Sequence, residues 1–355
     1  MSRALRPPSP AGEPAPAGPG ALQPAVPRAD LPYVGIATFA RAPHVAPDLL
    51  RPGDAHFAVF GVPFDGAVGY RPGQRLAPRA IRDLSTRYAL PWGPDNPGYW
   101  DIQDGRWYLA GCRLVDVGDA DPLYTDLEHL DRSVAAVIAA VLAAGAVPVV
   151  LGGDHSVTYP VLRALTPIFE SGGVWAGRRL HVVQIDAHLD FTDTVAGYAR
   201  SNSSPFRRAA ELPFVGTITV VGVRGIRTNP EAYAAAVGRG NRIVTMREVR
   251  RSGIEAALGH LPRGEPLYVS LDVDGLDPSV APGTSSPEPG GLTYEEVRAV
   301  LQAVTEAGPL AGLDVVEVNP YLDPGGVTSL LAARLAVEAM ALAYGTGHSQ
   351  EPEAR

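Results

Sequence analysis

The chain has 355 residues, a formal net charge of −8 at pH 7 and no lysine, so all 30 basic residues are arginines. Without lysine, the usual forms of the phosphate-binding loop, the pyridoxal Schiff base and the protein kinase site are excluded. The single cysteine, Cys112, excludes an intramolecular disulfide and any site that needs several thiolates, and it favours a reducing compartment. We therefore expect a cytoplasmic protein, and the acidic charge argues against non-specific binding to nucleic acid.

The N-terminal segment differs in composition from the rest of the chain. Residues 1–30 contain eight prolines and few large apolar side chains, a composition that is typical of disorder. No segment has the form of a secretory signal, and no stretch of about 18 apolar residues is free of charges and helix breakers, so we expect neither export nor membrane insertion. We predict a disordered segment over 1–32, a single domain over 33–347 and a short tail over 348–355.

Within the domain, short β-branched runs alternate with longer amphipathic stretches. In chain order the predicted strands are 56–60, 112–117, 147–151, 180–185, 217–222, 242–245, 266–273 and 312–317. The predicted helices are 77–88, 125–144, 156–168, 230–237, 247–259, 293–306 and 327–344. Several strands are continuously apolar, as strands covered on both faces are. The alternation predicts an α/β fold with three layers, in which helices cover both faces of a mainly parallel sheet of about eight strands.

Two long segments, 89–110 and 191–205, show no periodicity. Loops of that length inside a compact domain usually have a function. The 89–110 segment could line a substrate pocket, or it could pack its aromatic side chains at a subunit interface, and both alternatives remain open. In an open parallel sheet, ligands bind at the carboxyl ends of the strands, so we expect the chemistry in the residues that directly follow them.

Three of the predicted strands lead into groups of typical metal ligands. Alternate residues of an extended segment point to the same side, so acids and histidines at that spacing can converge on one point. The three groups are Gly-Gly-Asp-His-Ser over 152–156, Asp-Ala-His-Leu-Asp over 186–190 and Asp-Val-Asp-Gly-Leu-Asp-Pro over 272–278.

The three groups contain two histidines and six aspartates, and we expect both histidines and five of these carboxylates at one rim of the sheet. Carboxylates packed so closely would repel one another unless cations were present, and two divalent ions would nearly neutralise them. Imidazole and carboxylate ligands suit manganese, nickel, cobalt, iron or zinc, and a metal pair can supply a hydroxide at neutral pH. Each group alone has a simpler explanation, since Asp154 or Ser156 can cap a helix, and 272–278 can form a turn or a calcium-binding loop.

The three groups resemble the metal-binding signatures of the ureohydrolase family, which contains arginases, agmatinases and related amidinohydrolases. Similarity to the agmatinase branch covers roughly residues 34–345 and includes 38–43, 61–65, 71–73, 77–82, 281–284 and 314–320. The resemblance implies one metal held by His155, Asp186, Asp190 and Asp272, and a second metal held by Asp186, His188, Asp272 and Asp274. Asp186 and Asp272 would then bridge the two ions.

The resemblance also implies catalytic and binding roles. Asp190 would help to pass a proton to the leaving amine, and Glu317 would pair with the planar guanidinium, for which a carboxylate is suited because it accepts two parallel N–H bonds. Further implications are two divalent ions, manganese first and nickel second, a small guanidino substrate and a homotrimer or homohexamer.

One position departs from the family pattern. Asn202 stands where agmatinase-like members usually have a histidine. An imidazole can shuttle a proton near neutral pH, whereas an amide can only form hydrogen bonds. Either proton delivery to the leaving amine takes another path, or Asn202 contacts a different substrate, and its presence brings agmatine into question more than the hydrolysis itself.

The expected function is hydrolysis of a small guanidino compound to urea and an amine, with conversion of agmatine to putrescine as the first expectation. The alternatives are a guanidino acid hydrolase, acting on guanidinobutyrate or guanidinopropionate, and a guanidine hydrolase. If Arg200 points into the site, a substrate that carries a carboxylate is favoured. More distant alternatives are a single-zinc deacetylase of the same fold and a non-catalytic ligand-binding relative, and the complete ligand set argues against both.

Overall fold

The structure is a computed structural model that describes residues 31–347. The chain divides into two units, Met1–Gly35 and Ile36–Arg355, and all the elements of the fold belong to the second unit. The predicted disorder of the N-terminal segment concerns residues that lie almost wholly outside the described ones, and the predicted tail 348–355 lies outside them entirely.

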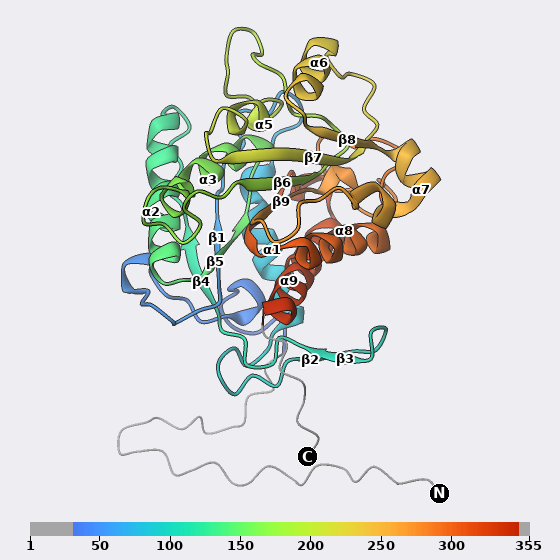
Figure 1. The fold of residues 1–355 in the computed structure, drawn as a ribbon. Coiled ribbons are helices and arrows are strands. Elements are labelled where there is room, and N and C mark those ends of the chain that lie inside the picture. Colours follow the sequence, from blue (N-terminus) through green and yellow to red (C-terminus); the bar gives the residue numbers. More distant parts are fainter. Residues whose placement is uncertain (1–30, 348–355) are drawn as a thin grey trace, which may run out of the picture. The chain divides into compact units, whose positions relative to one another are not determined.

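A sheet of eight strands forms the centre of the fold, as Figure 1 shows, in the order β4-β1-β5-β10-β9-β6-β7-β8. Every pair of neighbouring strands in this sheet is parallel. The predicted parallel sheet is therefore confirmed. The bounds are β1 Phe57–Gly61, β4 Leu114–Asp119, β5 Val147–Leu151, β6 Leu180–Ile185, β7 Val215–Val223, β8 Arg242–Thr245, β9 Leu267–Asp272 and β10 Leu310–Val316.

Helices cover both faces of the sheet and make the outer two layers (Figure 1). On one face lie α1 Ala77–Ser85, α7 Met246–Leu258, α8 Tyr294–Ala307 and α9 Val327–Gly347. On the other face lie α2 Leu127–Ala143, α3 Thr158–Ala164, α4 Thr166–Phe169, α5 Pro205–Ala209 and α6 Pro230–Gly238. Each face has its own hydrophobic core, and the predicted three-layer architecture is confirmed.

The strands alternate their side chains between the two cores. In β1, Phe57 and Val59 belong to the core beneath α1, α8 and α9, whereas Ala58 and Phe60 belong to the core beneath α2 and α3. All residues of the central strands β9 and β10 are buried. Burial on both faces explains why these strands are mostly apolar in the sequence rather than alternating between apolar and polar residues.

Two predicted helices are shorter in the structure. The predicted helix 156–168 divides at Leu165 into α3 and α4, and Pro167 lies in the first turn of α4. Proline has no N–H to donate to the preceding turn, so it is tolerated at a helix start and interrupts a helix interior. The predicted helix 77–88 ends as α1 at Ser85 and continues as a 3-10 turn over Thr86–Tyr88.

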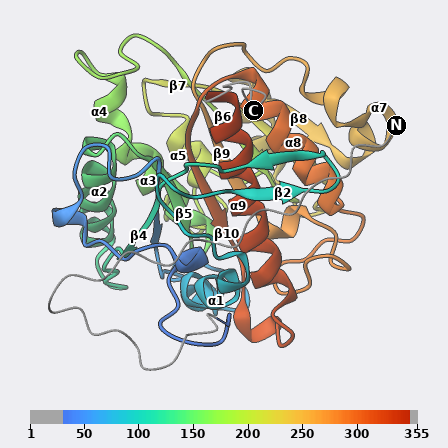
Figure 2. The same ribbon diagram turned by 90° about the horizontal axis from the view of Figure 1, so that it is seen from below.

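The segment 89–110 is not an irregular loop. It contains β2 Tyr99–Asp101 and β3 Arg106–Tyr108, which pair antiparallel. The chain enters β4 directly after this hairpin, so the hairpin lies at the amino-terminal end of the strands, and Figure 2 shows it next to α9 when the molecule is seen from below. It is therefore at the opposite end of the sheet from the residues that follow the strands.

Helix α9 is long and apolar enough to cross a membrane by length and composition alone, over Val327–Gly345. Within that window 67% of the residues are buried inside the fold, and the helix packs against α1, α8 and β10. These contacts make α9 a core helix, which is apolar because neighbouring elements cover it.

Candidate metal centre

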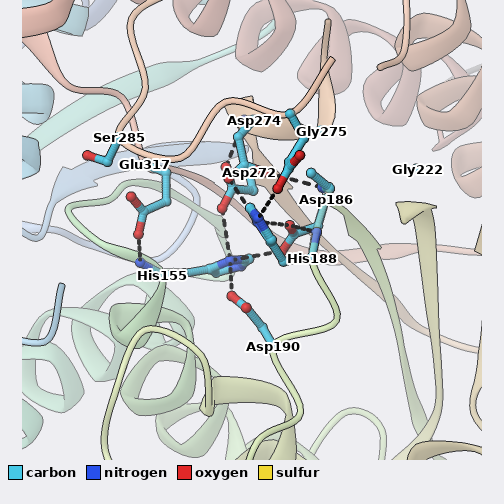
Figure 3. Close-up of polar contacts among 12 residues, drawn as sticks. His155, Asp186, His188, Asp190, Gly222, Asp272, Asp274, Gly275, Ser285 and Glu317 are labelled. Atoms are coloured by element: carbon cyan, nitrogen blue, oxygen red, sulfur yellow. Dashed lines mark hydrogen bonds and ion pairs between the residues drawn. The ribbon is translucent and has the colours of Figure 1, made fainter. Parts of the chain in front are cut away.

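Four neighbouring strands bring the predicted ligands together. Strands β5, β10, β9 and β6 are adjacent in the sheet, and because they are parallel their carboxyl ends meet at one edge. Figure 3 shows the resulting cluster. Its members are His155 after β5, Glu317 after β10, Asp272 and Asp274 at the end of β9, and Asp186, His188 and Asp190 after β6.

His155 forms the centre of the first group. Its Nδ1 atom lies 3.2 Å from Asp186 Oδ2, 3.0 Å from Asp190 Oδ2 and 3.1 Å from Asp272 Oδ2. Neighbouring ligands around an ion with bonds of about 2.1 Å are themselves about 3 Å apart. The three distances from Nδ1 therefore match the spacing of ligands that share one ion, and ligand atoms of His155, Asp186 and Asp190 also lie within 4.8 Å of one another.

His188 forms a second group beside the first. Its Nδ1 atom lies 3.1 Å from Asp274 Oδ2 and 3.5 Å from Asp186 Oδ1. Asp186 thus directs one oxygen to each histidine. Asp272 directs only Oδ2 to the His155 group, because its Oδ1 accepts the backbone N–H of Asp274 at 2.8 Å.

The nitrogen and oxygen atoms of the cluster are typical ligands of divalent cations, and their close packing is unfavourable in the absence of a cation. His155 Nε2 is 2.9 Å from Ser270 Oγ, and Ser270 donates its own proton to Asp314 Oδ1 at 2.6 Å. Ser270 must then accept from His155, so Nε2 carries a proton and Nδ1 is the nitrogen that can ligate a metal ion. Nδ1 is buried and makes no hydrogen bond among the described residues. A buried imidazole nitrogen that faces three carboxylate oxygens calls for a cation there, either a proton on Nδ1 or a metal ion that Nδ1 ligates.

The ionisation of the cluster indicates the same need for positive charge. Burial, followed by the charge of Asp186, raises the pKa of Asp190 to about 6. Burial lowers the pKa of the His155 imidazole, but the carboxylates of Asp186, Asp190 and Asp272 outweigh burial and hold this pKa well above its usual value. In the protein alone, protons therefore compensate the clustered acids, a function that divalent cations can take over.

Glu317 lies beside the cluster and is buried. Its Oε1 accepts the backbone N–H of His155 at 2.9 Å, and its Oε2 accepts Nε2 of Gln74 at 2.8 Å. Burial, followed by the charge of Asp154, raises the pKa of Glu317 to about 8. Each oxygen keeps a second lone pair, and a cationic ligand would favour the ionised form of Glu317, so the carboxylate can accept N–H groups from such a ligand.

Two of the candidate residues have a strained backbone. Asp190 has φ 46° and Glu317 has φ 64°, in the left-handed region that residues with a Cβ rarely adopt. Such conformations persist where the surrounding structure enforces them, and they are frequent at functional sites. The fold therefore holds these two carboxylates in place at some cost.

The expected fifth carboxylate does not join the cluster. Asp154 caps the 3-10 helix His155–Val157 by accepting from Ser156, and its Oδ2 accepts the N–H of Ala67 at 2.9 Å. Asp277 accepts the N–H groups of Gly290 and Gly291. The helix-cap alternative for Asp154 is thus correct, and four aspartates rather than five surround the histidines.

A close backbone approach explains the second glycine of the Gly-Gly-Asp-His-Ser segment. A Cβ on Gly153 would lie 1.7 Å from the carbonyl oxygen of Phe64, and this same oxygen accepts the N–H of Asp154 at 2.8 Å. Any side chain at this position would push the loop that carries His155 away from the neighbouring loop.

Asn202 contacts Ala67, the residue whose backbone N–H Asp154 accepts. Its backbone N–H donates to Ala67 at 3.3 Å, and its side chain is half-buried. Arg200 does not direct its guanidinium into the cluster, because it forms two hydrogen bonds with Asp131, at 2.9 and 2.8 Å, and lies over the ring of Tyr159. Arg200 therefore gives no reason to expect a substrate that carries a carboxylate.

Two aromatic residues of 89–110 lie at the other end of the sheet from the metal cluster. Tyr99 and Trp100 line a separate cavity of about 350 Å³ between the hairpin, residues 87–90 and α9. The interpretation of this segment as the lining of the substrate pocket is therefore wrong. Trp100 and Trp107 are half-exposed on the hairpin, which leaves the subunit-interface interpretation as a prediction.

Sequence reasoning missed three buried residues that support the cluster. Ser270 and Asp314 fix the tautomer of His155, and Gln74 contacts Glu317. Ser270 and Asp314 lie inside apolar strands, where an isolated buried polar residue is a usable signal. Gln74 follows the Arg-Pro-Gly segment at 71–73 and carried no such signal.

The fold and the cluster together define an α/β/α protein with a candidate metal centre at the carboxyl edge of its sheet. Within that class the chain belongs to the arginase family, whose family model matches residues 55–342. It is therefore a hydrolase of the ureohydrolase type, acting on C–N bonds of guanidino groups.

Relatives in this family differ in the substrates that their names give. Proclavaminate amidinohydrolase of Streptomyces clavuligerus is 36% identical over 86% of this chain and 92% of its own length. Guanidinopropionase of Pseudomonas aeruginosa is 35% identical over 87% of this chain and 92% of its own length. The mitochondrial agmatinase of Gallus gallus is 31% identical over 81% of each chain. A solved structure of the Streptomyces clavuligerus protein has a TM-score of 0.74 with 31% identity, covering 90% of this chain and all of that one.

Proposed function

We propose that this chain hydrolyses a small guanidino compound to urea and an amine. The observation that carries the proposal is the position of Glu317, whose Oε1 is bonded to the backbone N–H of His155 and therefore lies next to the His155 group. A carboxylate accepts two parallel N–H groups from a planar guanidinium. A head group held in this way would direct its carbon to the metal ligands.

The two groups of side chains would hold two divalent cations. His155, Asp186, Asp190 and Asp272 would bind one ion, and Asp186, His188, Asp272 and Asp274 would bind the other. Manganese is the first expectation and nickel the second, since imidazole and carboxylate ligands suit both ions. When bound, such a pair supplies a nucleophilic water of lowered pKa next to the guanidinium carbon.

Asp190 would move the proton that the reaction requires. Its carboxylate belongs to the His155 group, so it would lie next to the water that the ions bind. A carboxylate within hydrogen-bond reach of the reacting water can accept its proton and release it again. Asp190 would accept the proton of the attacking water and deliver it to the amine as the C–N bond breaks.

Two observations indicate which substrate tail, the part of the substrate beyond the guanidinium group, the site prefers. Asn202 offers no proton shuttle, and the relatives at 35–36% identity are a proclavaminate amidinohydrolase and a guanidinopropionase rather than an agmatinase. We therefore place guanidino acids before agmatine, the first expectation from the sequence. Asn202 would contact the tail through its amide, which can donate and accept.

A urea-release assay tests this proposal. The full chain, loaded with manganese or with nickel, is compared on guanidinobutyrate, guanidinopropionate, agmatine, arginine and guanidine, with chelator-treated protein as the control. We expect urea from at least one guanidino acid, faster than from agmatine, and none after chelation. Absence of urea from every compound with both metals would refute the chemistry, and agmatine as the best substrate would refute only the proposed tail.

A further inference from the structure

Gln74 begins a 3-10 turn, Gln74–Leu76, and is fully buried. The loop before it is tightly held, because Gly73 donates to Asp65 Oδ2 at 2.8 Å and Asn319 Nδ2 donates to the carbonyl of Arg71 at 3.0 Å. Gly73 has φ 149°, and a Cβ there would lie 2.3 Å from Asn319 Oδ1. The backbone that carries Gln74 therefore has little freedom to move.

The hydrogen bonds of its neighbours fix the orientation of the Gln74 amide. Ser285 Oγ donates its proton to the carbonyl of Arg71 at 2.7 Å, so it can only accept from Gln74. Glu317 Oε2, at 2.8 Å, also accepts. Both partners need a donor, which places Nε2 between them and uses both of its protons.

The other half of the amide has no partner. Gln74 Oε1 is buried and accepts no hydrogen bond among the described residues. Buried polar atoms in folded proteins are nearly always paired, so an orphan acceptor needs an explanation. Because Oε1 shares its amide group with Nε2, it lies next to the Glu317 carboxylate, where the proposed function places the head group of the substrate.

We propose that Gln74 is a second acceptor for the guanidinium head group and thereby helps to select the substrate. Its Oε1 takes an N–H group that Glu317 leaves unpaired, while its Nε2 holds the Glu317 carboxylate in position. A guanidinium has more N–H donors than one carboxylate can accept, and a site lined by acceptors rejects ligands that lack those donors. The inference rests on the proposed function, because it assigns the head group to Glu317.

Binding of guanidinium chloride at low millimolar concentration tests the inference without turnover. Calorimetric titration of the manganese-loaded chain compares wild type with Gln74→Met, which keeps the shape and removes both polar atoms. We expect the Kd for guanidinium to rise about tenfold, the size expected for one lost hydrogen bond to a charged group. Gln302→Met, an exposed change on α8, is the matched control and should leave the Kd unchanged.

A second variant and a second ligand separate binding from a purely structural role. Gln74→Glu restores an acceptor but loses the N–H donor to Glu317, so it should bind guanidinium more tightly than Gln74→Met, whereas a role confined to packing or to holding Glu317 predicts equally weak binding in both variants. Putrescine, which has no guanidinium, should bind all variants equally. With a substrate that turns over, Gln74→Met should raise KM about tenfold and change kcat less than about threefold.

The outcomes distinguish this inference from the proposed function. An unchanged Kd for guanidinium in folded Gln74→Met, or no rescue by Gln74→Glu, would overturn the role of Gln74. If Gln74→Met does not fold, the affinity of Gln74→Glu decides. If wild type binds guanidinium in a Gln74-dependent way but releases urea from no compound, the acceptor role stands and the proposed reaction fails.

Discussion

At the scale of single residues, the cluster assigns different tasks to acids that look alike in the sequence. Asp186 directs one oxygen to each histidine, whereas Glu317 contacts the His155 backbone and Gln74 but neither imidazole. Removing one charge at these two positions should therefore have different consequences, which separates metal binding from head-group binding.

Replacement of Glu317 tests that separation. We expect Glu317→Gln to lower kcat/KM at least about 30-fold, because a charge-assisted pair with a guanidinium contributes about 2 kcal/mol. Its metal content should equal that of wild type, since Glu317 is not in either group of candidate ligands. The measurements are steady-state kinetics and elemental analysis, with the exposed Glu255→Gln on α7 as control. Loss of metal in Glu317→Gln would show that this carboxylate acts on the ions instead.

The sequence predicts which residues lie at the strand ends better than it predicts their partners. His155, Asp186 and Asp272 were predictable because each directly follows or ends an apolar strand, and parallel strands align their ends. Asp154 belongs to the same segment as His155, but its side chain turns to the neighbouring loop at Ala67. Gln74 and Arg200 depend in the same way on loop packing, which local pattern does not encode.

At the scale of elements, the order of the strands brings the cluster together. β5, β10, β9 and β6 are adjacent although far apart in the chain, so the site depends on long-range pairing. The eight strands were predictable because continuous apolar runs separated by helices have few alternative arrangements. The β2–β3 hairpin was missed, although Asp104-Gly105 between aromatic residues is a hairpin signal.

The hairpin is attached to α8 by an acid-sensitive contact. Asp104 Oδ2 accepts the hydroxyl of Tyr108 at 2.6 Å and also pairs with Arg298 on α8. The Tyr108 hydroxyl, followed in the same direction by Arg298, lowers the pKa of Asp104. A carboxyl group with a lowered pKa stabilises the folded state above its ordinary pKa of about 4, and this contribution is lost as the pH falls through the lowered value.

We therefore expect Asp104→Asn to loosen the hairpin while leaving the distant cluster unchanged. Hydrogen exchange of the amides over 99–108 should become faster in the variant at neutral pH, by about threefold to tenfold, and urea release should match that of wild type. In wild type the same amides should lose protection on acidification below about pH 4. Equal exchange in variant and wild type would show that Asp104 does not hold the hairpin, and Asp83→Asn on the exposed face of α1 is the control.

At the scale of the whole molecule, the candidate metal centre lies at the carboxyl ends of the strands, and the aromatic hairpin lies at their amino-terminal ends. The three-layer fold was predictable from the alternation of elements, because a parallel sheet requires covering on both faces. The oligomeric state does not follow from the fold of one chain, so a trimer or hexamer stays a prediction. The net charge of −8 includes four aspartates that two divalent ions would neutralise.

The number of metal ions per chain tests the central claim most directly. The full chain, purified without chelator and equilibrated with manganese, is dialysed and analysed for metal and protein, with Asp186→Asn and the exposed Asp83→Asn in parallel. We predict about two ions per chain in wild type and in Asp83→Asn, and fewer than about one in Asp186→Asn, because this carboxylate faces both groups. One ion or none in wild type, or two ions retained by Asp186→Asn, would contradict the account.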